Sequence, residues 1–143
     1  MKLGHIALFV ALAIAASASC RAYDAFVVTM VGASRTSPVL AYSNEQGLAT
    51  ATEFAKKYRN EESVDSYLVD QCVVDRVYRL VGSSGRDDKD PSTAFFILDF
   101  VVRGKVRETK SITCSREVLN KVSEIVPPSV RGYLVLMYDR SKL

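Results

Sequence analysis

Residues 43–58 read SNEQGLATATEFAKKY, and this stretch decides the fold that the sequence predicts. Ser43 and Gln46 have the spacing of a capping box, which marks a helix N-terminus. Lys56 and Lys57 follow near the end, where positive charge suits the helix dipole. Apolar residues recur between them at helical spacing and form one stripe, which consists of Leu48, Ala51, Phe54 or Ala55, and Tyr58. We therefore expect an amphipathic helix over residues 43–58.

The segments on both sides of this helix are expected to be strands. One short apolar run precedes it, and the longer runs that follow are separated by polar, Gly- and Pro-containing turns. The expected strands are 25–31, 64–81, 94–102, 106–119 and 133–138, and the expected turns are 82–91, 103–104 and 127–132. This order predicts the α+β class, with one long helix packed across a four- to five-stranded antiparallel sheet.

The first 20 residues have the features of a secretory signal peptide. Lys2 supplies the positive start, and residues 6–16 form an apolar run that is too short to span a membrane. Small residues at 16–18 (ASA) suit cleavage after Ala18, and cleavage after Cys20 or Ala22 is also compatible. Residues 17–20 also loosely resemble a bacterial lipoprotein box, although its usual Leu is missing. We expect a secreted, extracellular protein with a leader at 1–20 and a single domain at 21–143.

Composition argues against most enzyme classes. The only histidine is His5, inside the leader, so the mature chain lacks a Ser-His-Asp triad, a Cys-His pair and histidine zinc ligands. No glycine-rich phosphate loop follows a strand. We therefore expect no enzymatic activity and predict no catalytic residue, no cofactor and no metal site.

The charge balance is too mild to indicate a nucleic-acid partner. Removing the leader, whose only charged residue is Lys2, changes the formal net charge from +3 to +2. Two small basic groups remain, and we interpret both as solvated surface: Lys56 with Lys57, and Arg103 with Lys105 and Arg107.

The cysteines leave two alternatives open. If cleavage follows Cys20, an exported chain keeps Cys72 and Cys114, which invites one disulfide. The expected meander, however, sets them roughly eight or nine residues apart along the strands, beyond disulfide reach at about 3.3 Å per residue. Either the strand registers differ from those expected, or both thiols are free, which we favour slightly.

Several short motifs in this chain occur in the same order as similar motifs in a known superfamily. Residues 53–58 (EFAKKY) are similar to the helix of secreted cystatins, and 78–80 (YRL) with 87–91 (DDKDP) are similar to cathelicidin pro-domains. Residues 98–102 (LDFVV), followed by Cys114 and 117–119 (EVL), are similar to the first half of latexin. Over residues 43–119 the chain thus resembles the cystatin superfamily, which implies one helix on an antiparallel sheet.

One further motif bears on inhibition. Inhibitory cystatins carry Gln-x-Val-x-Gly in a hairpin loop, and residues 71–75 read QCVVD, with Asp75 in place of the Gly. If this motif is aligned with the family, residues 71–75 form a tight loop that would enter a peptidase cleft. In the alternative, which we favour, residues 71–81 lie within a strand and 83–92 form the turn. The second inhibitory hairpin usually contains Pro-Trp, whereas this chain has Pro127 and Pro128 and no Trp.

The resemblance implies a secreted peptidase inhibitor that inserts loops into the cleft of a cysteine peptidase or a metallocarboxypeptidase. The expected partner is therefore a protein, a peptidase. The residues that would form the inhibitory wedge are Gly32, Gln71, Val73, Asp75, Pro127 and Pro128. The alternative is a non-inhibitory secreted binding or structural protein, such as a matrix, egg-envelope or host-defence component.

Overall fold

The sheet in the computed structural model has five strands in the order β3-β2-β1-β4-β5. The structure describes residues 20, 22–32, 38–59, 64–85 and 94–141. The strands are β1 (Ala25–Val31), β2 (Val39–Tyr42), β3 (Asp65–Leu68), β4 (Phe95–Val102) and β5 (Lys105–Thr113). Neighbouring strands pair antiparallel except β2 and β3, which are parallel. The sheet is therefore mixed, and the expectation of an antiparallel sheet throughout is wrong.

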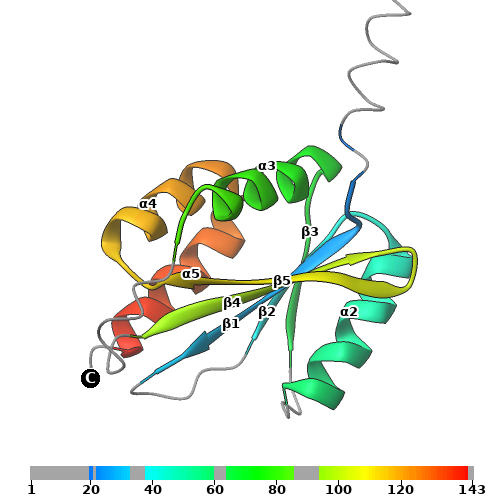
Figure 1. Ribbon diagram of the computed structural model, residues 1–143, viewed down its shortest axis with the longest axis horizontal. Coiled ribbons are helices and arrows are strands. Elements are labelled where there is room, and N and C mark those ends of the chain that lie inside the picture. Colours follow the sequence, from blue (N-terminus) through cyan, green and yellow to red (C-terminus); the bar gives the residue numbers. More distant parts are fainter. Residues whose placement is uncertain (1–19, 21, 33–37, 60–63, 86–93, 142–143) are drawn as a thin grey trace, which may run out of the picture.

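Helices cover both faces of this sheet. Figure 1 shows α2 on one face and α3, α4 and α5 on the other. The helices are α2 (Glu45–Tyr58), α3 (Gln71–Gly82), α4 (Arg116–Ile125) and α5 (Pro128–Ser141). The α+β class is confirmed, but the described chain has four helices instead of one. The parallel pair follows from this arrangement, because α2 connects β2 to β3 as a crossover helix.

The helix expected over residues 43–58 is confirmed as α2, with a shifted N-terminus. Asn44 is the N-cap, and its side chain accepts a hydrogen bond from the Gly47 backbone N–H at 2.8 Å. The Ser43 hydroxyl instead donates to the Asp24 backbone carbonyl at 2.9 Å. A Cβ on Gly47 would lie 2.9 Å from Asp24, so glycine lets the start of α2 lie close to the start of β1.

The inner face of α2 consists of small residues. Ala51 and Ala55 are fully buried, whereas Tyr58 is 58% exposed. Of the two stripes that the sequence left open, the one through Ala55 therefore faces the sheet. The aromatic side chains of Phe54 and Tyr58 do not belong to this buried face. They contribute instead to the outer surface described below.

The strand expected over residues 64–81 is wrong beyond its first residues. β3 is four residues long, and Asp70 then caps α3 by accepting from the Cys72 N–H at 2.8 Å. Val74, Val77 and Val81 are buried at helical spacing. The same segment also has apolar residues at every second position, so its pattern fits a strand as well as a helix. Both interpretations of residues 71–75, as a hairpin loop and as a strand, are overturned by the helix.

The last two expected strands also contain helix. β5 ends at Thr113, and the Ser115 hydroxyl accepts from the Val118 N–H at 3.2 Å to cap α4. Residues 133–138 lie inside α5, which begins at Pro128, a residue that suits the first helical position. The strand β2, at residues 39–42, was not predicted from the sequence.

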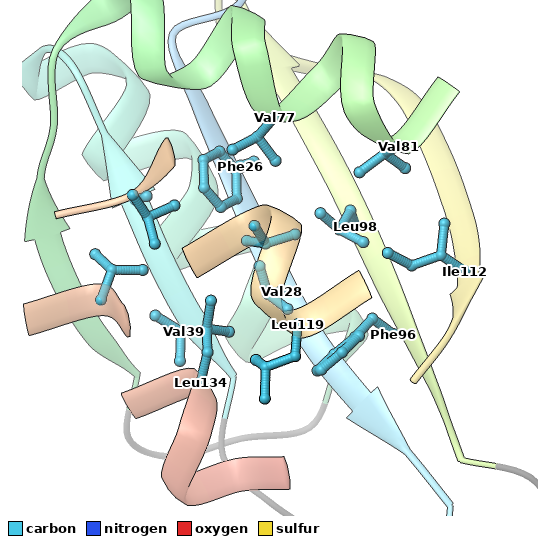
Figure 2. Close-up of a cluster of buried hydrophobic side chains, with 14 of the residues drawn as sticks. Phe26, Val28, Val39, Val77, Val81, Phe96, Leu98, Ile112, Leu119 and Leu134 are labelled. Carbon is cyan, nitrogen blue, oxygen red and sulfur yellow. The ribbon is translucent and has the colours of Figure 1, made fainter. Parts of the chain in front are cut away.

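Two apolar cores lie on opposite sides of the sheet. The larger one fills the space under α3, α4 and α5, and Figure 2 shows part of it, including Phe26, Leu98 and Leu119. The smaller one lies under α2 and consists of Ala25, Val27, Leu40, Ala51, Ala55 and Val101, all fully buried. None of the described helices combines the length and apolarity that crossing a membrane requires.

Candidate functional site

The residues proposed as an inhibitory wedge lie in separate places. The Gln71 side-chain amide donates to the Tyr23 carbonyl, which precedes β1, whereas Gly32 follows the last residue of β1. A strand of this length separates them by about 20 Å. Pro127 and Pro128 join α4 to α5, in the helical layer over the larger core. Gly32 and Gln71 therefore lie at opposite ends of the sheet.

The remaining two wedge residues belong to α3 and face inward. Val73 packs against the larger core, and Asp75 is only 3% exposed. Neither side chain is presented on a loop. The loops on which the inhibitor interpretation was based are therefore absent at residues 71–75.

A groove runs between α2 and the hairpin that joins β4 to β5, and we call it the α2–hairpin groove. Its volume is about 460 Å³. It is lined by Thr50, Glu53, Phe54, Lys57 and Tyr58 of α2 and by Gly104, Lys105 and Val106 of the hairpin. The hairpin turn expected at 103–104 is confirmed: Arg103 and Gly104 have φ of 50° and 78°, the positive values that a tight two-residue turn requires.

The groove brings together one lysine from each of the two basic groups of the sequence. Lys57 from α2 and Lys105 from the hairpin both line it, although β3, α3 and β4 separate them along the chain. Glu53 is the one acidic residue in the lining. The folded chain thus concentrates positive charge that the sequence presents as two small, unrelated clusters.

An aromatic pair forms the apolar part of this surface. The rings of Phe54 and Tyr58 are 5.0 Å apart between centroids, at one turn of α2. Lys57 Nζ lies 5.2 Å from the Tyr58 ring, and Arg59 Cζ lies 5.5 Å from the Phe54 ring, both within cation–π distance. An apolar surface edged by cations suits a ligand that carries both negative charge and an apolar group.

A buried aspartate fixes one end of the groove. Asp99 in β4 is completely buried and accepts from Arg59 Nε at 3.1 Å and from Arg59 Nη2 at 2.8 and 2.9 Å. Thr109 in β5 donates to the same carboxylate at 2.7 Å. These bonds tie the C-terminus of α2 to the centre of the sheet. An acidic residue inside the apolar run 95–102 was the signal in the sequence, and we did not interpret it.

A second aspartate fixes the other end. Asp24 accepts from the backbone N–H of Arg103 at 3.1 Å and from the Asn44 side-chain amide at 3.0 Å. It therefore joins the hairpin turn to the N-cap of α2. Because both walls are held at both ends, the groove is a preformed surface.

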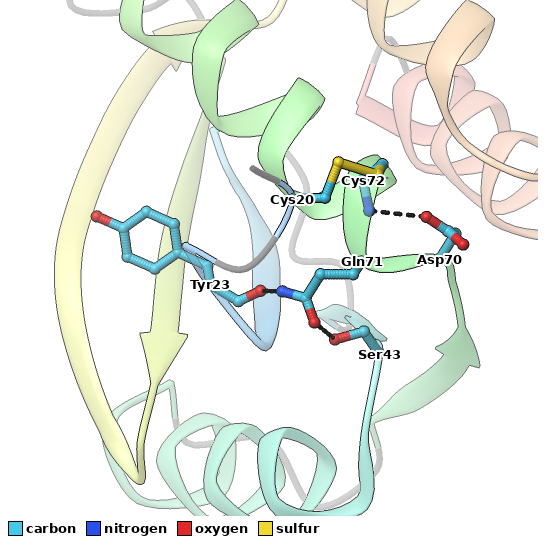
Figure 3. The surroundings of a disulfide bond; sticks show 6 residues. All are labelled: Cys20, Tyr23, Ser43, Asp70, Gln71 and Cys72. Atoms are coloured by element: carbon cyan, nitrogen blue, oxygen red, sulfur yellow. Dashed lines mark hydrogen bonds between the residues drawn. A yellow bond between two sulfur atoms is a disulfide. The ribbon is translucent and has the colours of Figure 1, made fainter. Parts of the chain in front are cut away.

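Several contacts fasten the N-terminal segment to α3, and we call this cluster the N-terminal junction. Figure 3 shows its members Cys20, Tyr23, Ser43, Gln71 and Cys72. Besides the bond from its amide to the Tyr23 carbonyl, the Gln71 side-chain oxygen lies 2.8 Å from the Ser43 hydroxyl, whose single proton is shared between this oxygen and the Asp24 carbonyl. Gln71 thus has a cross-linking position between two connections and is not a loop-tip residue.

A disulfide joins Cys20 to Cys72, with the Cα atoms 4.7 Å apart. The expectation that Cys72 is a free thiol is therefore wrong, whereas Cys114 is unbridged as expected. The error came from considering Cys72 and Cys114 as the pair and from placing Cys72 in a strand. The helix start at Gln71 brings Cys72 next to the segment that precedes β1.

Tyr23 also belongs to a polar group on the outer edge of the junction. Its hydroxyl donates to Glu108 Oε2 at 2.6 Å, and its ring lies 4.8 Å from that of Tyr78. Burial, and then the bond to Glu108, raise the pKa of Tyr23 well above its ordinary range. Bonds from Tyr23 and then Tyr78 lower the pKa of the Glu108 carboxyl. Glu108 therefore remains ionised at neutral pH and accepts hydrogen bonds from both tyrosine hydroxyls.

Within the described ranges, no three His, Cys, Asp or Glu side chains are grouped so that they could hold a metal ion. Comparison with protein-family models finds no match. No curated protein matches, and no solved structure matches. The resemblance to the cystatin superfamily thus receives no support from known proteins, and the implied fold is not confirmed.

Proposed function

We propose that this chain is an exported binding protein that holds an acidic peptide segment of a partner protein in the α2–hairpin groove. The observation that carries the proposal is the meeting of Lys57 and Lys105 beside an aromatic pair in one groove. This belongs to the non-inhibitory class of secreted binding proteins that the sequence left as the alternative.

The chemistry of the groove favours a peptide with mixed character. Lys57 and Lys105 attract carboxylates and speed encounter, although surface charges contribute modest affinity on their own. Phe54 and Tyr58 offer apolar area, and aromatic residues are the side chains most often found at energetic centres of interfaces. An acidic segment with at least one apolar or aromatic side chain satisfies both walls.

The disulfide supports the export part of the proposal. Disulfides form and persist in oxidising compartments outside the cytosol. The Cys20–Cys72 bond also supports cleavage after Ala18, because of the three positions considered only that one leaves Cys20 in the mature chain. It further argues against the lipoprotein interpretation, since a sulfur atom bonded to Cys72 is not available for lipid attachment.

The peptidase-inhibitor hypothesis remains a separate outcome of the experiment. Its wedge lies on opposite ends of the sheet and partly inside α3, so the groove is the better-formed surface. Tight inhibition of a papain-like peptidase or of a metallocarboxypeptidase would nevertheless overturn the proposal.

The test is fluorescence anisotropy with a short labelled peptide that is rich in Glu and contains one Tyr and one Leu. We expect binding that weakens with added salt and weakens about tenfold in the double variant Lys57→Gln/Lys105→Gln. Tyr58→Ala should weaken it by a similar factor. The matched control is Arg76→Gln/Lys121→Gln, which removes the same charge from α3 and α4 on the opposite face.

Three results would contradict the proposal. The peptide could fail to bind at micromolar concentration, or bind equally to the groove variants and the control. A sulfated oligosaccharide could instead bind in its place, which would assign the groove to a glycan.

A further inference from the structure

Of the two edges of the described sheet, the outer edge of β5 is the longer. β5 has nine residues and is the last strand in the sheet order, whereas β3, at the other edge, has four. Thr109 and Ser111, in the middle part of β5, are both exposed. An open edge of this length is a template for pairing with another extended chain.

The register of the β4–β5 pair shows which backbone groups of β5 point outward. The Cys114 N–H donates to the Ala94 carbonyl at 3.0 Å, so these two residues form a hydrogen-bonded pair. Bonded and unbonded pairs alternate in an antiparallel ladder, so Lys110 and its even-numbered neighbours bond to β4. The N–H and C=O groups of Thr109 and Ser111 therefore point away from β4, and no strand of the described chain pairs with them.

A β-bulge sets the limit of this edge. Phe100 pairs with Glu108, but Val101 pairs with Val106, so Arg107 is the extra residue on β5. Bulges at sheet edges bend the strand and interrupt its pairing. The regular edge thus runs from Glu108 to the end of β5, about 20 Å, and the exposed Arg107 lies next to its hairpin end.

The charge of β5 favours an acidic partner. Lys105, Arg107 and Lys110 place three cations along the strand. Glu108 is its one acidic side chain, and the Tyr23 hydroxyl already donates to it at 2.6 Å. The strand therefore has a net positive charge, which repels a second copy of β5 and attracts an acidic segment.

One side of this edge is continuous with the α2–hairpin groove. Lys105 and Val106, at the hairpin end of β5, line the groove beside α2 (Figure 1). The Thr109 hydroxyl donates to Asp99, which accepts from Arg59 at the C-terminus of α2, so the Thr109 side chain lies on the α2 face of the sheet. Since side chains alternate along a strand, every second side chain of an added strand would also lie on this face.

The other side of the edge offers a positive charge. Lys110 Nζ lies 5.7 Å from the Tyr78 ring of α3, so the Lys110 side chain lies on the face that α3 covers. An extended segment with acidic residues at every second position would place a carboxylate beside Lys110. Its intervening apolar or aromatic residues would lie on the groove side.

We infer that the acidic segment held by the α2–hairpin groove pairs with the outer edge of β5 as a sixth strand. The inference rests on the proposed function and specifies how the partner is held, in an extended conformation with its backbone bonded to Thr109 and Ser111. In this mode main-chain hydrogen bonds give affinity, and alternate side chains give specificity.

Amide hydrogen exchange followed by NMR tests this inference on the exported, disulfide-bonded protein. The probe is the Glu-rich peptide with one Tyr and one Leu, at saturating concentration. We expect exchange of the Thr109 and Ser111 N–H groups to slow at least about tenfold on binding, because each gains a hydrogen-bond partner. The amides of β3, on the opposite edge of the sheet, should keep their exchange rates.

Proline substitution provides a second test. Ser111→Pro removes an outward donor and leaves the bonds between β4 and β5, and proline is tolerated at such edge positions. The matched control is Ser66→Pro in β3. The Val69 N–H bonds to the Tyr42 carbonyl at 2.8 Å, so by alternation the Ser66 N–H also points outward. We expect Ser111→Pro to weaken peptide binding about tenfold and Ser66→Pro to leave it unchanged.

The outcomes separate this inference from the proposed function. If peptide binding depends on Lys57 and Lys105 but Thr109 and Ser111 exchange at unchanged rates, pairing with β5 is wrong and binding in the groove stands. A peptide that does not bind overturns both. Slower exchange of these two amides at higher protein concentration, without peptide, would overturn the inference and assign the edge to a second copy. Should Ser111→Pro fail to fold, the exchange rates of the wild-type protein decide.

Discussion

The two faces of the sheet are stabilised in different ways. Among the described residues, the face under α3, α4 and α5 has a core of 20 buried apolar residues, whereas the face under α2 has six. Three of those six are alanines, so α2 contributes little apolar area to its own attachment. Polar anchors at its two ends, Asp24 and Asp99, supply the attachment instead.

The difference explains where a binding surface can form. A helix held by burial must turn its large side chains inward, as α3 does with Val74, Val77 and Val81. A helix held at its ends can turn its large aromatic residues outward, as α2 does with Phe54 and Tyr58. The groove is thus a consequence of anchoring α2 by charge and hydrogen bonds.

The largest expected effect breaks the anchor of α2. Arg59→Ala leaves the Asp99 carboxylate buried with only the Thr109 hydroxyl as partner, so we expect a loss of about 3–5 kcal/mol in the free energy of unfolding. Urea unfolding followed by circular dichroism measures it. Lys56→Ala, an exposed change on the same helix, should stay within about 0.5 kcal/mol. A loss below about 1 kcal/mol for Arg59→Ala would mean that the small core alone holds α2.

The next largest effect is expected in α5, which packs on the larger apolar core. Leu134 in α5 is 2% exposed and Leu136 is 45% exposed. Leu134→Ala should cost about 2–5 kcal/mol, and Leu136→Ala should cost well under that. In the strand that the sequence suggested for 133–138, both side chains would lie on the same face of the sheet. The two variants would then lose similar amounts of unfolding free energy. Equal losses in the two variants would therefore contradict the helix.

The errors in the sequence-based fold have one physical cause. The helix at 43–58 was found because its polar and apolar residues differ clearly around the helix, and β1, β4 and the 103–104 turn were found from strong local signals. In α3 the apolar residues also alternate through Cys72, Val74, Tyr78 and Leu80, and in α5 residues 133–138 are apolar on both parities, so these segments also fit the period of a strand. Their caps, Asp70 and Pro128, were the signals that separate helix from strand.

The site was less accessible from the sequence than the fold. Lys57 and Lys105 become neighbours across a groove only when the crossover and the hairpin are both placed. Gln71 and Asp75 were singled out by a motif, and the structure places Gln71 in the N-terminal junction and buries Asp75 in α3. Cys20 was assigned to the leader, so its pairing with Cys72 lay outside the alternatives that were weighed.

A smaller effect concerns the covalent anchor of the apolar face. The Cys20–Cys72 disulfide closes a separation of 52 residues, and replacing both cysteines by Ser should cost about 2–4 kcal/mol. Cys114→Ser serves as the control for a cysteine outside the bridge. Denatured protein that begins at Ser19 should titrate as one thiol before reduction and three after it. Two or more thiols before reduction would show that α3 lacks this anchor.

The smallest expected effect concerns the polar contact of Glu108 with Tyr23 and Tyr78, on the side of the sheet that α3, α4 and α5 cover. It tests whether polar contacts stabilise that side as well. Bonds from Tyr23 and then Tyr78 lower the pKa of Glu108, so the folded state favours the ionised carboxylate. Its contribution is present above the unfolded-state pKa and is lost as the pH falls below about 4. Melting temperatures of wild type and Glu108→Gln should therefore differ at neutral pH and converge in acid. Glu124→Gln, at an exposed position on α4, should show a constant difference. If Glu108→Gln behaves like this control, Glu108 adds nothing to the apolar face, and polar anchoring is confined to the face that carries the groove.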